Sequence, residues 1–292
     1  MAISPQGQYL VYSQTNSDRN IWRVGLRGRE KGKAAPLIHS TRDESFQAYS
    51  SDGRKIVFES DRSGTEEIWV ANADGSDATQ LTMFNSGWSG SPYYSPDGQS
   101  IAFDRQEALT WAIYVMTAQG DKPVRVAASA ADDFRPGWSS DGRWIFFTSG
   151  RTGKFQIWKV PAAGGKALQV TKTGGAFQKE AIEGGAIYYL KEAGEVSSLW
   201  KCAEDGTQDH KVLGSIRDFS PAKSGIYFLP DKCSLALPLR FFDFHTQQTT
   251  TLLFMDGTRV DHRMSVSPDE RWMLFGQQDG TLGDLMLVKN FR

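Results

Sequence analysis

Four basic side chains occupy related places in the sequence, and together they could bind an anion. They are Arg135, Lys179, Arg217 and Arg263, and each precedes a short apolar segment. Guanidinium and ammonium groups that converge on one point bind a carboxylate or an acidic peptide end through charge-assisted hydrogen bonds. The candidate ligand-binding set also includes the polar and aromatic residues at or near the matching positions: Gln47, Trp88, Asp133 and Gln178.

A second interpretation of these cations is purely structural. They could pair with nearby carboxylates such as Glu44, Asp133 and Asp261 and form a solvated rim. The two interpretations differ in what a double substitution of Arg135 and Arg263 would do. Unchanged affinity for every ligand or partner would favour the rim.

Other chemical motifs in the sequence are weak. Residues 150–154 (Gly-Arg-Thr-Gly-Lys) resemble part of a phosphate-binding loop, but the leading Gly and the final Ser or Thr are missing. There is no Gly-x-Ser-x-Gly nucleophile motif, and the four histidines fall at different positions of different repeats. We therefore expect no catalytic residues, no metal site and no cofactor.

The elements that must position the basic residues form a repeat. A bulky residue follows Ile, Leu or Phe in each copy, and the copies are 42 to 47 residues apart. The bulky residues are Trp22, Trp69, Tyr114, Trp158, Trp200, Phe242 and Met286. A repeat of this length along the whole chain indicates a propeller or solenoid architecture.

Each repeat predicts four short strands. A turn such as Ser95-Pro96-Asp97-Gly98 precedes an apolar segment such as Ile101-Ala102-Phe103, and a polar turn, the bulky-residue strand and a short polar strand follow. No segment has helical periodicity. We therefore predict an all-β, seven-bladed β-propeller of four-stranded antiparallel blades in one domain, 1–292. The blade boundaries are roughly 1–40, 41–84, 85–128, 129–172, 173–214, 215–256 and 257–292.

Two details of this prediction are open. The sixth repeat carries Pro230, Pro238 and an irregular hairpin, so a six-bladed ring is the alternative. The seventh repeat ends at its third strand, which predicts an exposed sheet edge and an edge-strand dimer through that blade, or else a frayed edge covered by water. Trp158→Ala should cost about 3–5 kcal/mol if the bulky residues fill the gaps between blades.

Composition excludes several function classes. The net charge is −1 and the pI is about 6.4, so no nucleic-acid surface is expected. No apolar run approaches the ~20 residues that cross a bilayer, so no membrane contact is expected from this segment.

Cys202 and Cys233 are expected to be buried free thiols, with one disulfide as the alternative. The chain starts within its first repeat, which suggests a piece of a longer protein.

The repeat resembles the TolB-type, WD40-like propeller repeat. Residues 92–98 (Pro-Tyr-Tyr-Ser-Pro-Asp-Gly), 101–103 (Ile-Ala-Phe) and 113–116 (Ile-Tyr-Val-Met) carry the resemblance, which extends over essentially the whole chain. The last segment is similar to the end of propellers fused behind bacterial winged-helix regulators or receptor-type kinases. By resemblance alone, this implies an interaction domain of a larger bacterial signalling protein, and a periplasmic or extracytoplasmic location.

The function that these observations favour is binding. We expect a non-catalytic propeller that binds a protein, peptide or small ligand at its channel mouth, as a sensor or scaffold. The alternative is a propeller enzyme, a polysaccharide lyase or hydrolase, with its active site at the channel mouth. A metal scan and a pH–activity screen on oligosaccharides would separate the two. A third possibility is a structural assembly module, which light scattering would reveal.

Overall fold

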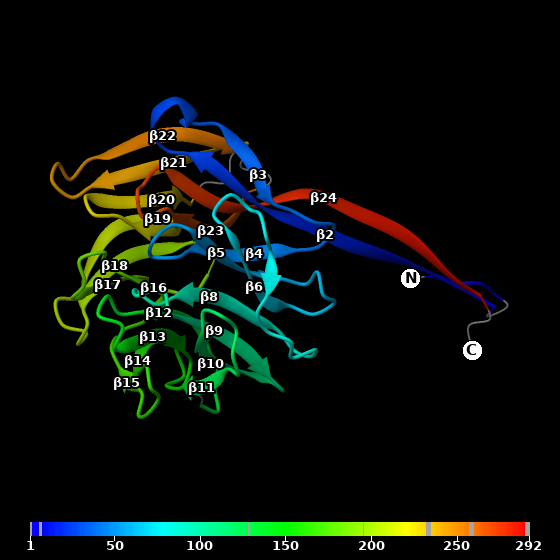
Figure 1. Ribbon diagram of the computed structural model, residues 1–292, viewed down its shortest axis with the longest axis horizontal. Coiled ribbons are helices and arrows are strands. Elements are labelled where there is room, and N and C mark those ends of the chain that lie inside the picture. The colour runs from blue at the N-terminus through cyan, green and yellow to red at the C-terminus, as the bar shows by residue number, and fades with distance from the viewer. Residues whose placement is uncertain are drawn as a thin grey trace.

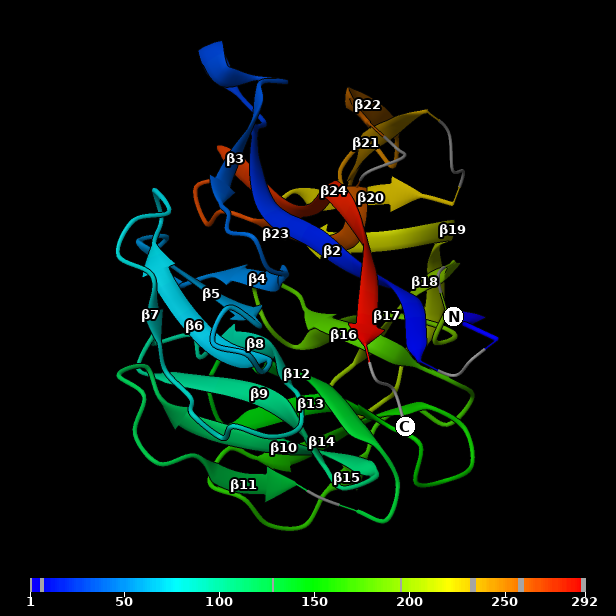
Figure 2. The ribbon, with the colours of Figure 1, turned by 90° about the vertical axis from the view of Figure 1, so that its right-hand side faces the viewer.

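The fold is built from β-strands, as predicted. The computed structural model describes residues 2–5, 8–127, 129–194, 196–231, 235–256 and 260–289. Within these residues the one helical element is a short 3-10 turn, η1 (Gly28–Glu30). Figures 1 and 2 show a stack of sheets with a long two-stranded arm projecting from it.

Three sheets follow the predicted repeat directly. Each contains four antiparallel strands that pair in chain order, and we name each unit by its innermost strand. The β4 unit contains β4 (Glu44–Tyr49), β5 (Lys55–Ser60), β6 (Glu67–Asn72) and β7 (Thr79–Gln80). The β8 unit contains β8 (Ser89–Tyr94), β9 (Ser100–Glu107), β10 (Thr110–Thr117) and β11 (Val124–Ala127). The β12 unit contains β12 (Asp133–Trp138), β13 (Trp144–Ser149), β14 (Gln156–Pro161) and β15 (Leu168–Gln169).

A shared strand joins two further units into one seven-stranded sheet. Its strands are β16 (Ala176–Glu180), β17 (Ala186–Leu190), β18 (Ser197–Ala203), β19 (His210–Pro221), β20 (Gly225–Pro230), β21 (Ala236–Asp243) and β22 (Thr249–Asp256). The first half of β19 pairs with β18, and its second half, from Ile216 onward, pairs with β20. The strand is therefore outermost in the β16 unit and innermost in the β19 unit.

The two ends of the chain share the remaining sheet, and this corrects the prediction of separate first and seventh blades. The order β23-β24-β2 is extended by β3 along one part of β2 and by β1 along another. The strands are β1 (Ala2–Ile3), β2 (Tyr9–Gly25), β3 (Ala34–Ile38), β23 (Val260–Val266) and β24 (Trp272–Lys289). Because β24 pairs with β2 from Trp272 to Lys289, the last repeat shares a sheet with the start of the chain instead of forming a separate seventh blade.

The reason for this difference lies in a segment that looks like a turn. Asp279-Gly280 is a dipeptide typical of turns, but it lies inside the continuous strand β24. The Asp279 carboxylate accepts hydrogen bonds from the Asn20 amide and the Trp22 indole, each at 2.9 Å. These bonds between the two chain ends favour pairing of β24 with β2 over a local hairpin.

Six apolar clusters hold neighbouring units together. Between the β4 and β8 units, for example, Val57 packs with Ile101 and Phe103. The cluster in which Leu239 and Met273 take part joins the β19 unit to the sheet that contains both chain ends. The contacts therefore pass from unit to unit and return to the first, as around the axis of a β-propeller.

The predicted wedge residue Trp158 lies between units but is only partly buried. It packs against the cluster between the β8 and β12 units, and the Arg151 guanidinium lies 4.5 Å from its ring. Because burial is incomplete, we expect Trp158→Ala to lower the free energy of unfolding by about 2–3 kcal/mol, at or below the low end of the range for buried aromatics. Urea denaturation would measure this. The exposed Trp88→Ala variant is the control, and equal effects of the two substitutions would contradict the packing role.

One of the two cysteines can be placed. Cys202 is a buried free thiol, as expected, and burial raises its pKa to about 12. Cys233 lies outside the described residues.

Candidate functional site

A β-bulge interrupts the innermost strand at the same point in successive units. The strand register shifts within residues 45–48, 90–93, 134–137 and 176–179. One residue in each stretch adopts a left-handed backbone conformation, with φ of 52° at Phe46, 49° at Ser91 and 56° at both Arg135 and Phe177. A bulge changes the direction of the side chain and stores backbone strain. Its repetition therefore makes these positions candidates for a functional site.

The bulge residues obey a simple rule of spacing. Each stands four positions before the residue whose backbone N–H donates across the following turn, as Phe46 precedes Ser50 and Phe177 precedes Ala181. Ala222 donates in the same way to Gly225, so the equivalent residue in β19 is Asp218. The six equivalent positions are Phe46, Ser91, Arg135, Phe177, Asp218 and Arg263.

This rule corrects the sequence alignment in the two irregular units. In the β16 unit the alignment started the turn at Ile182 instead of Ala181, which selected Gln178 in place of Phe177. In the β19 unit the segment from Ser220 to Gly225 was expected to carry extra residues, but the turn begins at Ala222 and is shorter. The predicted site residue of this unit was therefore Arg217, and Asp218 was missed.

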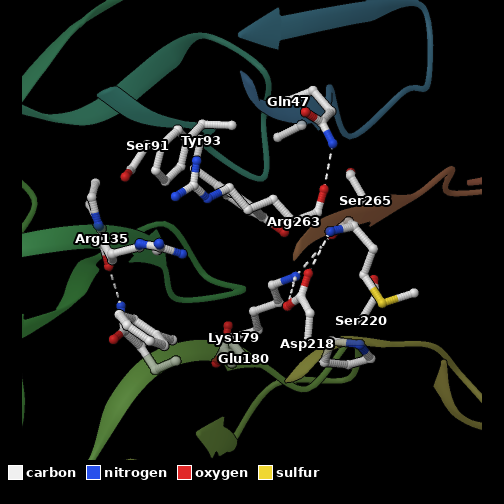
Figure 3. Close-up of a pocket in the computed structure, with 18 of the residues that line it drawn as sticks. Gln47, Ser91, Tyr93, Arg135, Lys179, Glu180, Asp218, Ser220, Arg263 and Ser265 are labelled. Carbon is white, nitrogen blue, oxygen red and sulfur yellow. Dashed lines mark hydrogen bonds and ion pairs between the residues drawn. The ribbon is translucent and has the colours of Figure 1, made fainter. Parts of the chain in front are cut away.

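All six positions line one cavity of about 170 Å³ between the innermost strands (Figure 3). Five of the eight predicted ligand-binding residues are among its lining residues: Gln47, Arg135, Gln178, Lys179 and Arg263. Arg135 and Arg263 extend into the cavity from different strands, and Lys179 lies on another side with Asp218 (Figure 3). The cavity therefore combines three cations from three different units.

Two guanidinium groups share one aromatic ring in this cavity. The Cζ atom of Arg263 lies 3.3 Å from the ring centroid of Phe46, and that of Arg135 lies 4.8 Å from the same centroid. Arg135 also lies 4.4 Å from the Phe177 ring. Cation–π contacts hold both groups in place. Both guanidinium groups also oppose the rise that burial causes in the pKa of the Asp104 carboxyl.

The Lys179 side chain contacts the two units that follow its own along the chain. Its Nζ atom donates to the carbonyl oxygens of Phe219 at 2.7 Å and Met264 at 3.0 Å, and it lies 3.8 Å from a carboxylate oxygen of Asp218. Burial lowers the pKa of Lys179, and Asp218 partly opposes this effect. An ammonium group has three N–H donors, so one can still point to a ligand.

Two amide side chains form hydrogen bonds with the backbone of residues in neighbouring innermost strands. The Nε2 atom of Gln178 donates to the carbonyl of Arg135 at 2.6 Å, and that of Gln47 donates to the carbonyl of Arg263. The amide oxygen of Gln47 is buried and has no hydrogen-bond partner among the described residues. Such an atom is costly to leave unsatisfied, so it adds an unused acceptor to the cavity wall.

Three predicted site residues lie elsewhere. Trp88 is 56% exposed outside the cavity, and Arg217 is not among the lining residues. Asp133 is fully buried and pairs with Arg151 at 2.8 Å, while Glu44 pairs with Arg62 at 2.9 Å. Asp133 and Glu44 therefore pair with arginines that do not line the cavity, Arg151 and Arg62. The side chains of Asp261 and His262 lie outside the described part of the structure.

Glu59 and Asp104 form a pair of carboxylates behind the bulge of β8. Gly90 leaves the space that the Glu59 carboxylate occupies, and Asp104 accepts the backbone N–H of Arg135 at 2.7 Å. Burial, and repulsion by Asp104 and Glu66, raise the pKa of Glu59 to about 7, although Arg263 and the Ser45 hydroxyl oppose the shift. This carboxyl therefore titrates close to neutral pH.

The raised pKa of Glu59 makes stability depend on pH. The folded protein binds a proton here that the unfolded chain releases between about pH 4.5 and 7, so stability falls as the pH rises through this window. We expect Glu59→Gln to remove about 2 kcal/mol of the difference between pH 5 and pH 8. Urea titrations at both values measure it, with exposed Glu183→Gln as the control. An identical pH dependence in Glu59→Gln and the wild type would refute the assignment.

Among the described residues, no group of three or more His, Cys, Asp or Glu side chains is placed to hold a metal ion. None of the helical structure among these residues could cross a membrane.

One family model matches part of the chain. The model of the TolB β-propeller domain matches residues 84–228. The repeats of this segment are therefore TolB-type propeller repeats. The resemblance to the TolB-type repeat is thereby confirmed, and the matched region contains the bulges at Ser91, Arg135 and Phe177.

Several known proteins are similar to this chain in sequence or in structure. The uncharacterized protein Atu1656 of Agrobacterium fabrum is 26% identical over 175 residues, which cover 58% of this chain and 56% of that protein. A TolB candidate from Agrobacterium tumefaciens gives a TM-score of 0.71 at 18% identity, over 91% of this chain and 99% of that one. TolB from Acinetobacter baumannii gives 0.62 at 16% identity, over 94% and 66%. The chain thus spans little more than half of the curated relative.

An enzyme is also among the structural relatives. An oligogalacturonate lyase in complex with manganese gives a TM-score of 0.56 at 14% identity, over 92% of this chain and 78% of that one. At such low identity the likeness concerns the fold alone.

Proposed function

We propose that this TolB-type propeller is a non-catalytic binding domain whose channel cavity takes an anionic group of a protein, peptide or small ligand. We also propose that its six four-stranded units are the six blades of one closed ring, and that the domain acts as the interaction or sensor part of a larger bacterial protein. The observation that carries the proposal is the pair of arginines, Arg135 and Arg263, stacked on the Phe46 ring beside Lys179.

Three features support an anion as the ligand. The cavity lies where the innermost strands of all units meet, so it gathers side chains from distant parts of the sequence. Its cations are held by aromatic rings and carbonyl groups, and this preorganisation lowers the entropic cost of binding. A planar guanidinium also matches the geometry of a carboxylate.

Titration with small anions tests the proposal. Succinate, citrate and triglycine would be titrated into the wild type and the Arg135→Gln/Arg263→Gln double variant, with binding followed by calorimetry. We expect the double variant to lose at least about tenfold in affinity for every anion that the wild type binds. The control replaces two exposed turn residues, in Arg54→Gln/Arg143→Gln. Equal affinity of both double variants for each anion would overturn the proposal.

A lyase or hydrolase is the second candidate, and one feature of the cavity favours it. Lys179 has a lowered pKa, as a general base requires, and it shares the cavity with Arg135 and Tyr93. Incubation with oligogalacturonate, with and without added manganese, would test this candidate through the appearance of an unsaturated product. Turnover that is lost in Lys179→Met would replace the binding proposal with an enzymatic one.

A further inference from the structure

A second hollow, of about 450 Å³, lies between the β16 and β19 units. We call it the basic groove, because its lining includes four basic side chains: Lys201, His210, Lys211 and Lys223. Among the described residues, only Ile182 lines both this groove and the channel cavity. The basic groove is therefore a separate place on the molecule, built from other side chains.

One wall of the basic groove is a row of side chains across three strands. Tyr188 on β17 lies opposite Lys201 on β18, and Lys201 in turn lies opposite His210 on β19. Directly opposed residues of antiparallel strands share one face of the sheet, with Cβ atoms about 4.5–5.5 Å apart. The Lys201 ammonium nitrogen lies 5.3 Å from the centroid of the Tyr188 ring. An ammonium group and an imidazole thus lie side by side on this wall.

The other wall carries a further lysine. Phe244 donates its N–H to the carbonyl oxygen of Ser224 at 2.9 Å, which holds Phe244 beside the turn that contains Lys223. The Phe244 ring is nearly parallel to the Tyr188 ring, with centroids 6.1 Å apart and an angle of 8° between the planes. This aromatic pair connects the two walls, with Lys201 on one of them and Lys223 on the other.

The lining of the basic groove has an excess of positive charge. In the described part of the chain no ion pair joins a carboxylate to any of its lysines, Lys201, Lys211 and Lys223. One carboxylate, Glu183, is among the lining residues, and it lies in an exposed turn. Three lysines and one glutamate favour an anion as the ligand.

Two further carboxylates near the basic groove in sequence have partners of their own. Asp209, next to His210, pairs with Lys191 at 3.4 Å. Asp243, next to Phe244, accepts two backbone N–H groups of its own turn at 2.9 and 2.8 Å. These bonds satisfy the two carboxylates locally and lower the pKa of Asp243. Neither carboxylate is among the residues that line the groove.

The donors of the basic groove suit a phosphate group better than a carboxylate. The Nδ1 atom of His210 lies 2.7 Å from the carbonyl oxygen of Gln208, and since a carbonyl oxygen only accepts, Nδ1 carries the hydrogen and Nε2 is left to meet a ligand. Lysine binds phosphate as a point charge, whereas paired recognition of a carboxylate favours the planar fork of arginine. No arginine is among the described lining residues.

We propose that the basic groove binds a small phosphate monoester, with its phosphate group between Lys201, His210 and Lys223 and its organic group against Phe244. The Phe244 ring is only partly buried, and Ile182 beside it in the lining is 52% exposed, so both offer apolar surface. The phosphate oxygens accept hydrogen bonds from both walls, so the ligand bridges the β16 and β19 units. The inference is independent of the proposed function, because these three cations do not line the channel cavity.

Three small molecules test the ligand class. Phenyl phosphate carries both the phosphate and an apolar ring, phenylacetate replaces the phosphate with a carboxylate, and benzyl alcohol has no charge. Each is titrated into the wild type and followed by calorimetry. We expect phenyl phosphate to bind at least about tenfold more tightly than either of the other two.

Protein variants locate the binding. Lys223→Gln/His210→Gln replaces two exposed side chains, so the fold should be kept, and we expect it to weaken phenyl phosphate about tenfold. The matched control Lys122→Gln/Lys154→Gln removes two exposed lysines of other units and should bind like the wild type. Phe244→Ser should bind phenyl phosphate no better than inorganic phosphate. Circular dichroism checks that each variant is folded.

Two results would overturn the inference. Phenyl phosphate that binds no more tightly than benzyl alcohol or phenylacetate would exclude a phosphate site. Equal affinity of the Lys223→Gln/His210→Gln variant and its control would place the anion elsewhere on the molecule. A loss of affinity seen only in Arg135→Gln/Arg263→Gln would then assign it to the channel cavity, which would leave the proposed function standing and the basic groove without a ligand.

Discussion

Arg151→Met is expected to lower the free energy of unfolding by about 3–5 kcal/mol, because it leaves a fully buried carboxylate without its counter-ion. Arg151 donates from one guanidinium nitrogen to both oxygens of Asp133 at 2.8 Å, and Asp133 has no exposed surface. The guanidinium also stacks on Trp158 at 4.5 Å. Equilibrium urea unfolding would measure the loss.

Two controls separate loss of the partner from loss of the side chain. Asp133→Leu/Arg151→Met removes both charges and should recover most of the stability, since paired burial gains little over apolar packing. Arg143→Met removes an arginine whose side chain is 78% exposed and should change stability by less than about 0.5 kcal/mol. A double variant as unstable as Arg151→Met would show that the carboxylate is not the cause.

This ion pair explains why Asp133 looked like a site residue in the sequence. It lies two residues before Arg135, in the segment that leads into the channel, so position alone cannot separate the two. What separates them is the direction of the strand at the bulge, which buries Asp133 and turns Arg135 inward. The β4 unit repeats the arrangement with Glu44 and Arg62, so it belongs to the repeat and not to a ligand site.

The strands themselves could be predicted from local patterns. Apolar segments such as Ile101-Ala102-Phe103 are fully buried on both faces, as a continuous apolar run indicates. The pairing of the two chain ends in one sheet could not be predicted in the same way. It joins residues that are far apart in the chain, as the hydrogen bonds from Asn20 and Trp22 to Asp279 do. A single sequence contains no record of such pairing, so the first and last repeats were counted separately.

The sequence alignment found residues that line the cavity in several units and missed one where the turn is short. Alignment on the turn of the β12 unit selected Arg135, which lines the cavity. The same procedure missed Asp218, because the turn after Ala222 is shorter than its counterparts. The sharing of the Phe46 ring by two arginines was also missed, since it depends on strand positions in three units.

Gly206→Ala is expected to destabilise the protein by more than about 3 kcal/mol, although it adds only one methyl group. Gly206 has a φ of +82°, and an added Cβ atom would overlap the carbonyl oxygen of Val170 in the neighbouring unit. Gly75 and Leu37 are related in the same way. The glycine in this turn is therefore required by the close approach of the neighbouring unit as well as by its own backbone conformation.

Gly153→Ala is a matched control for this prediction. Gly153 has a φ of +86°, but no atom lies within 4 Å of the position its Cβ would take. This substitution should cost only the strain of a left-handed alanine, about 1 kcal/mol. Thermal and urea unfolding of both variants give the difference. Equal losses of stability would mean that backbone strain alone explains why position 206 requires glycine. The contact between units at this turn would then contribute nothing to that requirement.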